Sequence, residues 1–356
     1  QFGAPEIGTF LHESLRVLGQ RLLREQKQWR DLPQLDEEAL CKAVIEEIAA
    51  DVKLGEEGNI YEMVLRQRLE DTLRRTVARL SDWSQKSAFD TKYLEQNFGG
   101  GTKSWPPVMI PLGGANHIRL QGQLDRVDEW TDGQRTYGLV VDYKTGNIKV
   151  SASEIYYGLK LQLVTYLLAL EKAQRSSGLV PAALVYSFVQ NPRITTSNLV
   201  TEVTAPALVA EKGDVRNTGY YTDDLDILVK MDETLETTKG KKTPYVPIRI
   251  SSKGTIYASD MYLTKSAAQF NVLTDYAQDV MSRAGTHMLE GHFPISPYNY
   301  NDAIPCSYCQ YKALCRFENT RNSYRYITKL SEDEALEKME KGDDVYEVDA
   351  RTTTGD

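Results

Sequence analysis

The chain has 356 residues, of which 41% are hydrophobic and 26% are charged, and its formal net charge at pH 7 is −8. This composition is typical of a globular protein with one large core or two smaller ones. The sequence contains no apolar run of about 18 residues and no signal peptide, which excludes a membrane-spanning chain of the helical kind.

The acidic excess is concentrated at the C-terminal end. Residues 331–356 hold ten acidic and three basic side chains, so that this tail carries −7 and the rest of the chain is near neutral. We expect the tail to be solvated and partly disordered. The near-neutral body can still present basic patches to phosphates. A first candidate patch lies on the helix predicted over 59–86: Arg66, Arg68, Arg74, Arg75 and Arg79.

Helical spacing of apolar residues dominates the first third of the chain, and predicts helices over 5–26, 35–53 and 59–86. The pattern then changes to apolar runs and alternation of strand length, and predicts strands over 91–98, 117–129 and 136–143. A helix over 154–175 and a buried strand over 180–190 follow. This order predicts an α/β fold with a mixed central sheet flanked by helices.

The predicted elements divide the chain into five parts. They are a helical N-terminal part (1–90), a sheet-containing core (91–190), a polar and irregular insertion (191–264), a C-terminal helix with a cysteine segment (265–325) and an acidic tail (326–356). Because the chain begins at Gln1 and enters a helical pattern at once, we expect it to be a piece of a longer protein.

The strongest chemical signal is an Asp-x-Lys pair at the end of a predicted strand. Asp142 and Lys144 are two residues apart, so their side chains point to the same face of the strand. A carboxylate that holds a divalent cation beside an ammonium group suits phosphodiester hydrolysis. Asp125, on the preceding strand, can supply a second oxygen ligand, and such ligands favour Mg²⁺ or Mn²⁺. An isolated Asp-x-Lys is more often a surface pair, but the apolar run from Leu139 to Val141 favours the site.

Four further side chains are weaker candidates. Gln162 and Tyr166 are spaced i and i+4 on one helix face, where they could bind a DNA backbone, or the helix could merely pack against the core. His12, on the first helix, is either a structural histidine or a nitrogen ligand of the same cation. Glu95, on the first strand, is a candidate additional acid.

Three of the four cysteines form a Cys-x2-Cys-x5-Cys segment: Cys306, Cys309 and Cys315. In a reducing compartment such spacing indicates metal or iron–sulfur binding, and both zinc and a [4Fe–4S] cluster need four ligands. Cys41 is the remaining cysteine, and its position on a predicted helix suits a buried core residue better than a fourth ligand.

Taken together, these motifs resemble the RecB-type branch of the PD-(D/E)XK nucleases. The family pattern is G-x-x-x-H on a helix, G-x-x-D-R-x-D and V-D-Y-K on strands, and Q-x-x-x-Y on the next helix. Here it corresponds to Gly8/His12, Gly122/Asp125/Arg126/Asp128, Val141/Asp142/Tyr143/Lys144 and Gln162/Tyr166. The cysteine segment is similar to that of the iron–sulfur branch of the family. The amino-acid sequence around the motifs is similar to that of AddB-type nuclease domains.

The resemblance implies a restriction-endonuclease-like core, with Cys306, Cys309 and Cys315 as cluster ligands and the fourth cysteine upstream of residue 1. It also implies that metal ligation comes from His12, Asp125, Asp142 and the Tyr143 carbonyl, and that Lys144 is catalytic. The implied function is that of a DNA exonuclease module in the bacterial cytoplasm. It would process double-strand breaks with an AddA-like helicase–nuclease subunit in a heterodimer, and degrade the 5′-ended strand.

Two alternatives remain at this point. A stand-alone RecB-like nuclease, Cas4-like or exonuclease-V-like, fits the motifs, although the long insertion and the non-Met start disfavour it. A catalytically silent iron–sulfur DNA-binding module is the other. The intact set of His12, Asp125, Asp142 and Lys144 disfavours it, because a silent site needs none of these residues.

Overall fold

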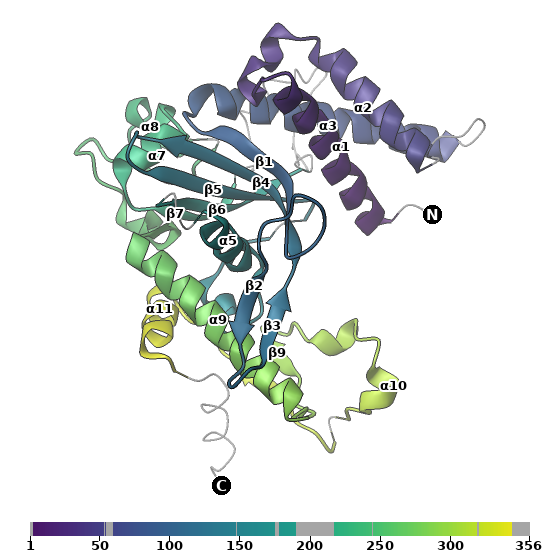
Figure 1. Ribbon diagram of the computed structural model, residues 1–356, viewed down its shortest axis with the longest axis vertical. Coiled ribbons are helices and arrows are strands. Elements are labelled where there is room, and N and C mark those ends of the chain that lie inside the picture. Colours follow the sequence, from purple (N-terminus) through teal and green to yellow (C-terminus); the bar gives the residue numbers. More distant parts are fainter. Residues whose placement is uncertain are drawn as a thin grey trace, which may run out of the picture. The chain divides into compact units, whose positions relative to one another are not determined.

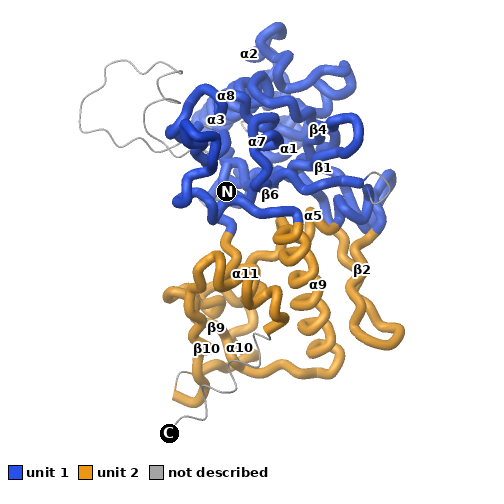
Figure 2. The backbone as a smooth tube through the Cα atoms, turned by 90° about the vertical axis from the view of Figure 1, so that its left-hand side faces the viewer, with its two compact units in different colours: residues 1–106, 122–150, 169–267 blue, residues 107–121, 151–168, 268–356 orange. Residues whose placement is uncertain are grey.

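A computed structural model describes residues 3–52, 54, 60–146, 148–174, 178–189, 217–243, 245–318 and 320–343. The chain divides into two compact units (Figure 2). Unit 1 comprises residues 1–106, 122–150 and 169–267, and unit 2 comprises residues 107–121, 151–168 and 268–356. Within the described ranges, no helix combines the length and the apolar character needed to cross a membrane.

Unit 1 begins with the helices that the apolar spacing predicts: α1 (Ala4–Arg24), α2 (Glu37–Asp51) and α3 (Ile60–Lys86), with a 3-10 turn η1 (Trp29–Gln34) between the first two. The α1 helix buries Leu11, Leu15, Leu18 and Leu22, which recur every three or four residues along one face. Helix α2 begins at an N-cap, Asp36, whose carboxylate accepts a hydrogen bond from the Ala39 amide.

The same unit contains a six-stranded sheet in the order β1-β4-β5-β6-β7-β8 (Figure 1). Its strands are β1 (Asp90–Phe98), β4 (Gly122–Thr131), β5 (Thr136–Lys144), β6 (Val180–Phe188), β7 (Thr218–Thr222) and β8 (Thr264–Lys265). The β5–β6 and β7–β8 pairs are parallel, and the other three pairs are antiparallel. The predicted mixed sheet flanked by helices is therefore confirmed.

The two faces of this sheet have different roles. Leu139, Val141 and Tyr143 of β5 belong to the core that also contains the buried side chains of α1, α2 and α3. Because side chains alternate along a strand, Asp142 and Lys144 point to the opposite face. The core-facing residues thus fix the strand, and the alternation leaves the carboxylate and the ammonium group on the other side.

The sheet is larger than the sequence pattern suggested. Residues 217–265, predicted to be irregular, supply β7 and β8 together with α7 (Leu225–Met231), α8 (Thr234–Thr237) and η3 (Ala258–Leu263). Residues 191–216 of the same predicted insertion lie outside the described residues. The short strands were missed because β7 has only five residues and β8 only two, too few for a periodic pattern.

Unit 2 contains a hairpin of β2 (Val108–Pro111) and β3 (His117–Leu120), the helices α4 (Ala152–Tyr156) and α9 (Ala267–Leu289), and the N-terminal half of α5 (Gln162–Ala173). The predicted strand 117–129 is thus two strands, β3 and β4, in different units. The remaining elements are β9 (Tyr298–Tyr300), η4 (Pro305–Ser307), α10 (Lys312–Cys315), β10 (Arg325–Ile327) and α11 (Glu332–Lys341).

The start of the acidic tail is ordered, contrary to the expectation from its charge. Helix α11 has a capping box in which Ser331 and Glu334 exchange hydrogen bonds. It packs on α4, where Glu332 accepts a hydrogen bond of 3.1 Å from the Ala152 amide. Ala335, Leu336 and Met339 are buried. The apolar face of the helix outweighs its charge, and residues 344–356 lie outside the described residues.

Candidate functional site

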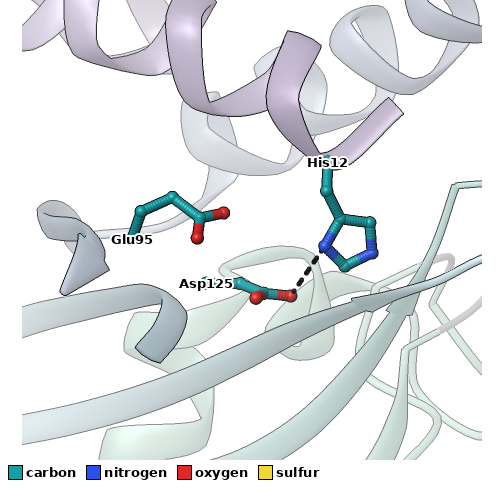
Figure 3. Close-up of side chains that lie close together, drawn as sticks. All are labelled: His12, Glu95 and Asp125. Carbon is teal, nitrogen blue, oxygen red and sulfur yellow. Dashed lines mark ion pairs between the residues drawn. The ribbon is translucent and has the colours of Figure 1, made fainter. Parts of the chain in front are cut away.

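Three potential metal ligands from distant parts of the sequence converge in unit 1. His12 projects from α1, Glu95 from β1 and Asp125 from β4, and one ligand atom of each lies within 4.8 Å of the others (Figure 3). His12 Nδ1 lies 3.3 Å from Asp125 Oδ2. One imidazole and two carboxylates form a mixed nitrogen and oxygen donor set of the kind that binds divalent cations.

The strand register explains why Glu95 joins this group. Strands β1 and β4 pair Leu94 with Arg126 and Gln96 with Leu124, so Glu95 stands opposite Asp125. Its backbone has a φ of +48°, in the left-handed region that residues other than glycine rarely adopt. Such strained backbone is concentrated at functional sites. The weak prediction for Glu95 therefore gains support from its geometry.

The Asp-x-Lys pair lies at the end of β5. Lys144 Nζ forms an ion pair with Asp142 Oδ2, and it also lies 5.5 Å from the centre of the Tyr186 ring. The Asp142 side chain is only 1% exposed, and among the described residues its Oδ2 has this ion pair but no well-oriented hydrogen bond. Tyr186 was missed in the sequence because only the parallel register, which pairs it with Asp142, reveals its position.

Asp125 connects the two parts of the site. Its Oδ2 accepts a hydrogen bond of 2.7 Å from the Tyr143 amide, in the strand segment between Asp142 and Lys144. The β4–β5 register, which pairs Arg126 with Val141, places Asp125 next to Asp142. Unit 1 therefore brings together five of the candidate residues: His12, Glu95, Asp125, Asp142 and Lys144.

The carboxylates of this site carry mutually repulsive charge. Burial and the charge of Asp125 raise the pKa of Glu95 to about 8, and the same two causes raise the pKa of Asp142 to about 6. Burial opposes protonation of His12, but the hydrogen bond and charge of Asp125 outweigh it and raise the His12 pKa. A divalent cation would relieve this repulsion, so the donor set fits a metal ion.

The second aspartate of the Gly122–Asp128 motif has a different role. Asp128 and Asp125 lie on opposite faces of β4, and Asp128 receives two hydrogen bonds from Arg126, of 2.6 and 2.7 Å. Both side chains are 3% exposed, and the guanidinium lies between the rings of Trp29 and Trp83. This buried ion pair supports the core beneath the site. Gly122, at the start of the motif, is required because a Cβ there would lie 2.8 Å from the Phe98 ring.

Gln162 and Tyr166 lie in unit 2. The Gln162 side-chain amide donates a hydrogen bond of 3.0 Å to the Tyr166 hydroxyl, so the two do share one face of α5 as predicted. Gln162 is exposed and the Leu163 and Val164 side chains are buried, as expected of a helix that packs through its apolar face. Their part in substrate binding stays a prediction.

The cysteine segment also belongs to unit 2. Cys306, Cys309 and Cys315 are half-buried free thiols, and the Tyr311 amide donates to Cys309 Sγ at 3.4 Å. In the described part of the chain these sulfurs do not lie within 4.8 Å of one another. One zinc ion would hold them about 3.8 Å apart, from Zn–S bonds of about 2.3 Å. Cys41 is fully buried in the unit 1 core, as expected of a packing residue, and burial raises its pKa to about 12.

The arginine patch predicted on α3 is only partly available. Arg79 donates to the Phe188 carbonyl and is half-buried, so it supports the fold and does not face solvent. Arg66 Nη2 lies 3.6 Å from Glu46 Oε1, and Arg74 Nη1 lies 3.9 Å from Glu38 Oε1. These partners reduce the charge that α3 offers to a phosphate.

Comparison with known proteins agrees with this geometry. A family model described as the PD-(D/E)XK nuclease superfamily matches residues 1–316. The AddB subunit of the ATP-dependent helicase/deoxyribonuclease of Clostridioides difficile (strain 630) is 30% identical over 349 residues, which is 96% of this chain and 30% of that protein. The AddB subunits of Bacillus thuringiensis (strain Al Hakam) and Bacillus anthracis are each 30% identical over 348 residues, 94% of this chain and 29% of theirs. The chain thus spans less than a third of the length of these relatives.

Proposed function

We propose that this chain, which belongs to the PD-(D/E)XK nuclease superfamily, is a divalent-metal-dependent deoxyribonuclease. The observation that carries the proposal is the convergence of His12, Glu95 and Asp125 beside the Asp142–Lys144 ion pair. A catalytically silent DNA-binding module would not need strained backbone at Glu95 or a buried, charge-repelled Asp142.

The residues that would hold the metal are His12, Asp125, Asp142 and the Tyr143 carbonyl, with Glu95 as an additional or water-mediated ligand. A bound Mg²⁺ or Mn²⁺ polarises the phosphodiester and lowers the pKa of a coordinated water. Lys144, fixed by Asp142 and by the Tyr186 ring, would orient the attacking water and offset charge on the phosphate oxygens. Gln162 and Tyr166 would bind the DNA backbone.

The relatives are named as subunits of a helicase/deoxyribonuclease. We extend the proposal accordingly: the chain is the nuclease module of an AddB-like subunit, it pairs with an AddA-like helicase–nuclease subunit, and the complex processes double-strand breaks in the bacterial cytoplasm. In this complex it would degrade the 5′-ended strand as an exonuclease.

Incubation with linear and with covalently closed circular single-stranded DNA tests the proposed activity. We expect Mg²⁺-dependent degradation of the linear strand, none in EDTA, and much slower loss of the circle. The polarity is determined by comparing the products of a 5′-labelled strand with those of a 3′-labelled strand. Binding of both DNAs without any metal-dependent cleavage would identify the silent module instead.

The raised pKa values predict how metal binding depends on pH. Between about pH 5 and pH 8, Glu95 and Asp142 bind more protons in the folded apo-protein than when unfolded, so apo-protein stability falls as pH rises. Metal binding needs both carboxylates deprotonated and His12 neutral. We therefore expect Mg²⁺ to raise the thermal unfolding midpoint more at pH 8 than at pH 6. An equal shift at both pH values, or a larger one at pH 6, would contradict the ligand assignment.

For the cysteine segment we propose a [4Fe–4S] cluster held by Cys306, Cys309 and Cys315, with a fourth cysteine supplied by sequence upstream of residue 1. Three cysteines at this spacing and one from elsewhere in the protein would supply the four thiolates that such a cluster needs. A cluster that joins unit 2 to an upstream segment would close a loop of some 300 residues. By restricting the unfolded chain it would stabilise the folded protein by roughly 6 kcal/mol on the loop-entropy scale.

Metal analysis of the full-length protein tests the cluster. We expect about four iron atoms per chain and visible absorption, both lost in Cys309→Ser. Cys41→Ala serves as the matched control, because it removes a cysteine from the core and leaves the segment intact. Bound zinc without iron, or full iron content in Cys309→Ser, would rule the cluster out.

A further inference from the structure

Unit 1 has a second polar feature on the helix that carries His12. A cavity of about 180 Å³ is lined by Arg16, Val17, Gln20, Arg21 and Arg24 of α1 and by Glu47 of α2. Three of these six residues are arginines and one is acidic, so the lining is cationic. Arginine presents a planar fork of N–H donors that matches the oxygen atoms of a phosphate group.

The three arginines differ in how firmly they are held. Arg16 forms an ion pair with Glu13 and donates a hydrogen bond of 2.9 Å to Gln20, which orients its guanidinium. Arg21 forms an ion pair with Glu47 across the cavity. Arg24 is exposed and, among the residues that the structure describes, has no ion-pair partner. Arg16 and Arg21 are thus partly neutralised by their acidic partners, and Arg24 is the arginine of the cavity whose charge is left for a ligand.

Helix geometry relates this cavity to the metal-ligand group. Arg16 and Gln20 follow His12 by one and two helical turns on the same side of α1. A rise of about 1.5 Å per residue puts Gln20 about 12 Å along the helix from His12. The Arg16 charge also lowers the pKa of Glu95, so the two side chains are near enough to interact electrostatically. For a DNA strand that follows α1, about 12 Å corresponds to roughly two to four nucleotides.

From these observations we propose that the α1 cavity binds one backbone phosphate of the DNA strand whose scissile phosphate, two to four nucleotides away, lies at His12, Glu95 and Asp125. The inference rests on the proposed nuclease function and adds a substrate-positioning subsite to it. Gln20 and the arginines would contact the phosphate oxygens, and Glu47 would limit the affinity by neutralising Arg21.

Affinity for a labelled single-stranded oligonucleotide, measured in EDTA so that no cleavage occurs, tests the subsite. Arg24→Ala should weaken binding and lower the slope of log affinity against log salt by roughly 0.7, the value for one lost phosphate contact on a single strand. Glu47→Gln should strengthen binding, because it releases Arg21. Two control variants remove the same charges elsewhere in unit 1, at exposed residues: Arg135→Ala in the turn between β4 and β5, and Glu236→Gln on α8.

Equal effects of Arg24→Ala and Arg135→Ala, or of Glu47→Gln and Glu236→Gln, would overturn the subsite in favour of a general charge effect. A second measurement locates the subsite along the DNA. In a series of oligonucleotides, one phosphate at a time is replaced by an uncharged methylphosphonate group. Cleavage should slow at one position two to four nucleotides from the cut, and Arg24→Ala should abolish that sensitivity. If cleavage stays metal-dependent but no position is sensitive, the subsite is wrong and the nuclease assignment stands; without any cleavage the nuclease assignment itself is wrong.

Discussion

Replacing Asp142 by Asn is expected to reduce metal-dependent DNA cleavage by about 10²–10³-fold or more while leaving the fold intact. The substitution keeps the shape of the side chain but removes the negative charge that would hold the cation and that fixes Lys144. Lys144→Gln should produce a loss of similar size. The difference between the two lies in metal affinity, which Asp142→Asn should weaken and Lys144→Gln should not, as titration calorimetry with Mg²⁺ can measure.

The control for these variants is Asp132→Asn. Asp132 is an exposed aspartate in the turn that joins β4 to β5, so its substitution removes the same charge away from the site. Circular dichroism and thermal unfolding should match the wild type for Asp142→Asn, since removal of a repelled, buried carboxylate relieves strain. Wild-type cleavage rates in a folded Asp142→Asn variant would remove this residue from the active site.

Replacing Asp128 by Ala should have the largest effect on stability, about 3–5 kcal/mol in the free energy of unfolding. The substitution leaves the Arg126 guanidinium buried, 3% exposed, without the carboxylate that receives two of its hydrogen bonds. An isolated buried cation is costly because it loses its hydration without compensation. Urea unfolding monitored by tryptophan fluorescence suits the measurement, since Trp29 and Trp83 flank the guanidinium.

A surface ion pair provides the comparison. Asp82 forms an ion pair with Lys86 on α3, and its side chain is 48% exposed. Asp82→Ala should therefore lower the free energy of unfolding by less than about 1 kcal/mol. Combining Arg126→Met with Asp128→Leu should recover much of the stability lost in Asp128→Ala, because both charges are removed together. A loss in Asp128→Ala no larger than in Asp82→Ala would show that the buried pair contributes little.

The sequence by itself predicted the strand regions of β1, β4, β5 and β6 and identified the candidate residues of the site. The apolar run from Leu139 to Val141 predicts a buried strand, and alternation along it then places Asp142 and Lys144 on one face. Helical spacing likewise predicted α1, α2 and α3 to within a few residues. These features are local: they depend on spacings of two to four residues, which a single sequence displays directly.

Only the tertiary structure decided which distant groups meet and which charges are structural. Glu95 reaches the site because the β1–β4 register sets it opposite Asp125, and Tyr186 reaches Lys144 through the parallel pairing of β5 with β6. Packing likewise gives Arg79 a structural role, since it donates a hydrogen bond to the Phe188 carbonyl, whereas Arg68 and Arg75 of the same helix are exposed. Strand register, helix packing and burial are set by contacts between residues far apart in the chain, so no local pattern of residues encodes them.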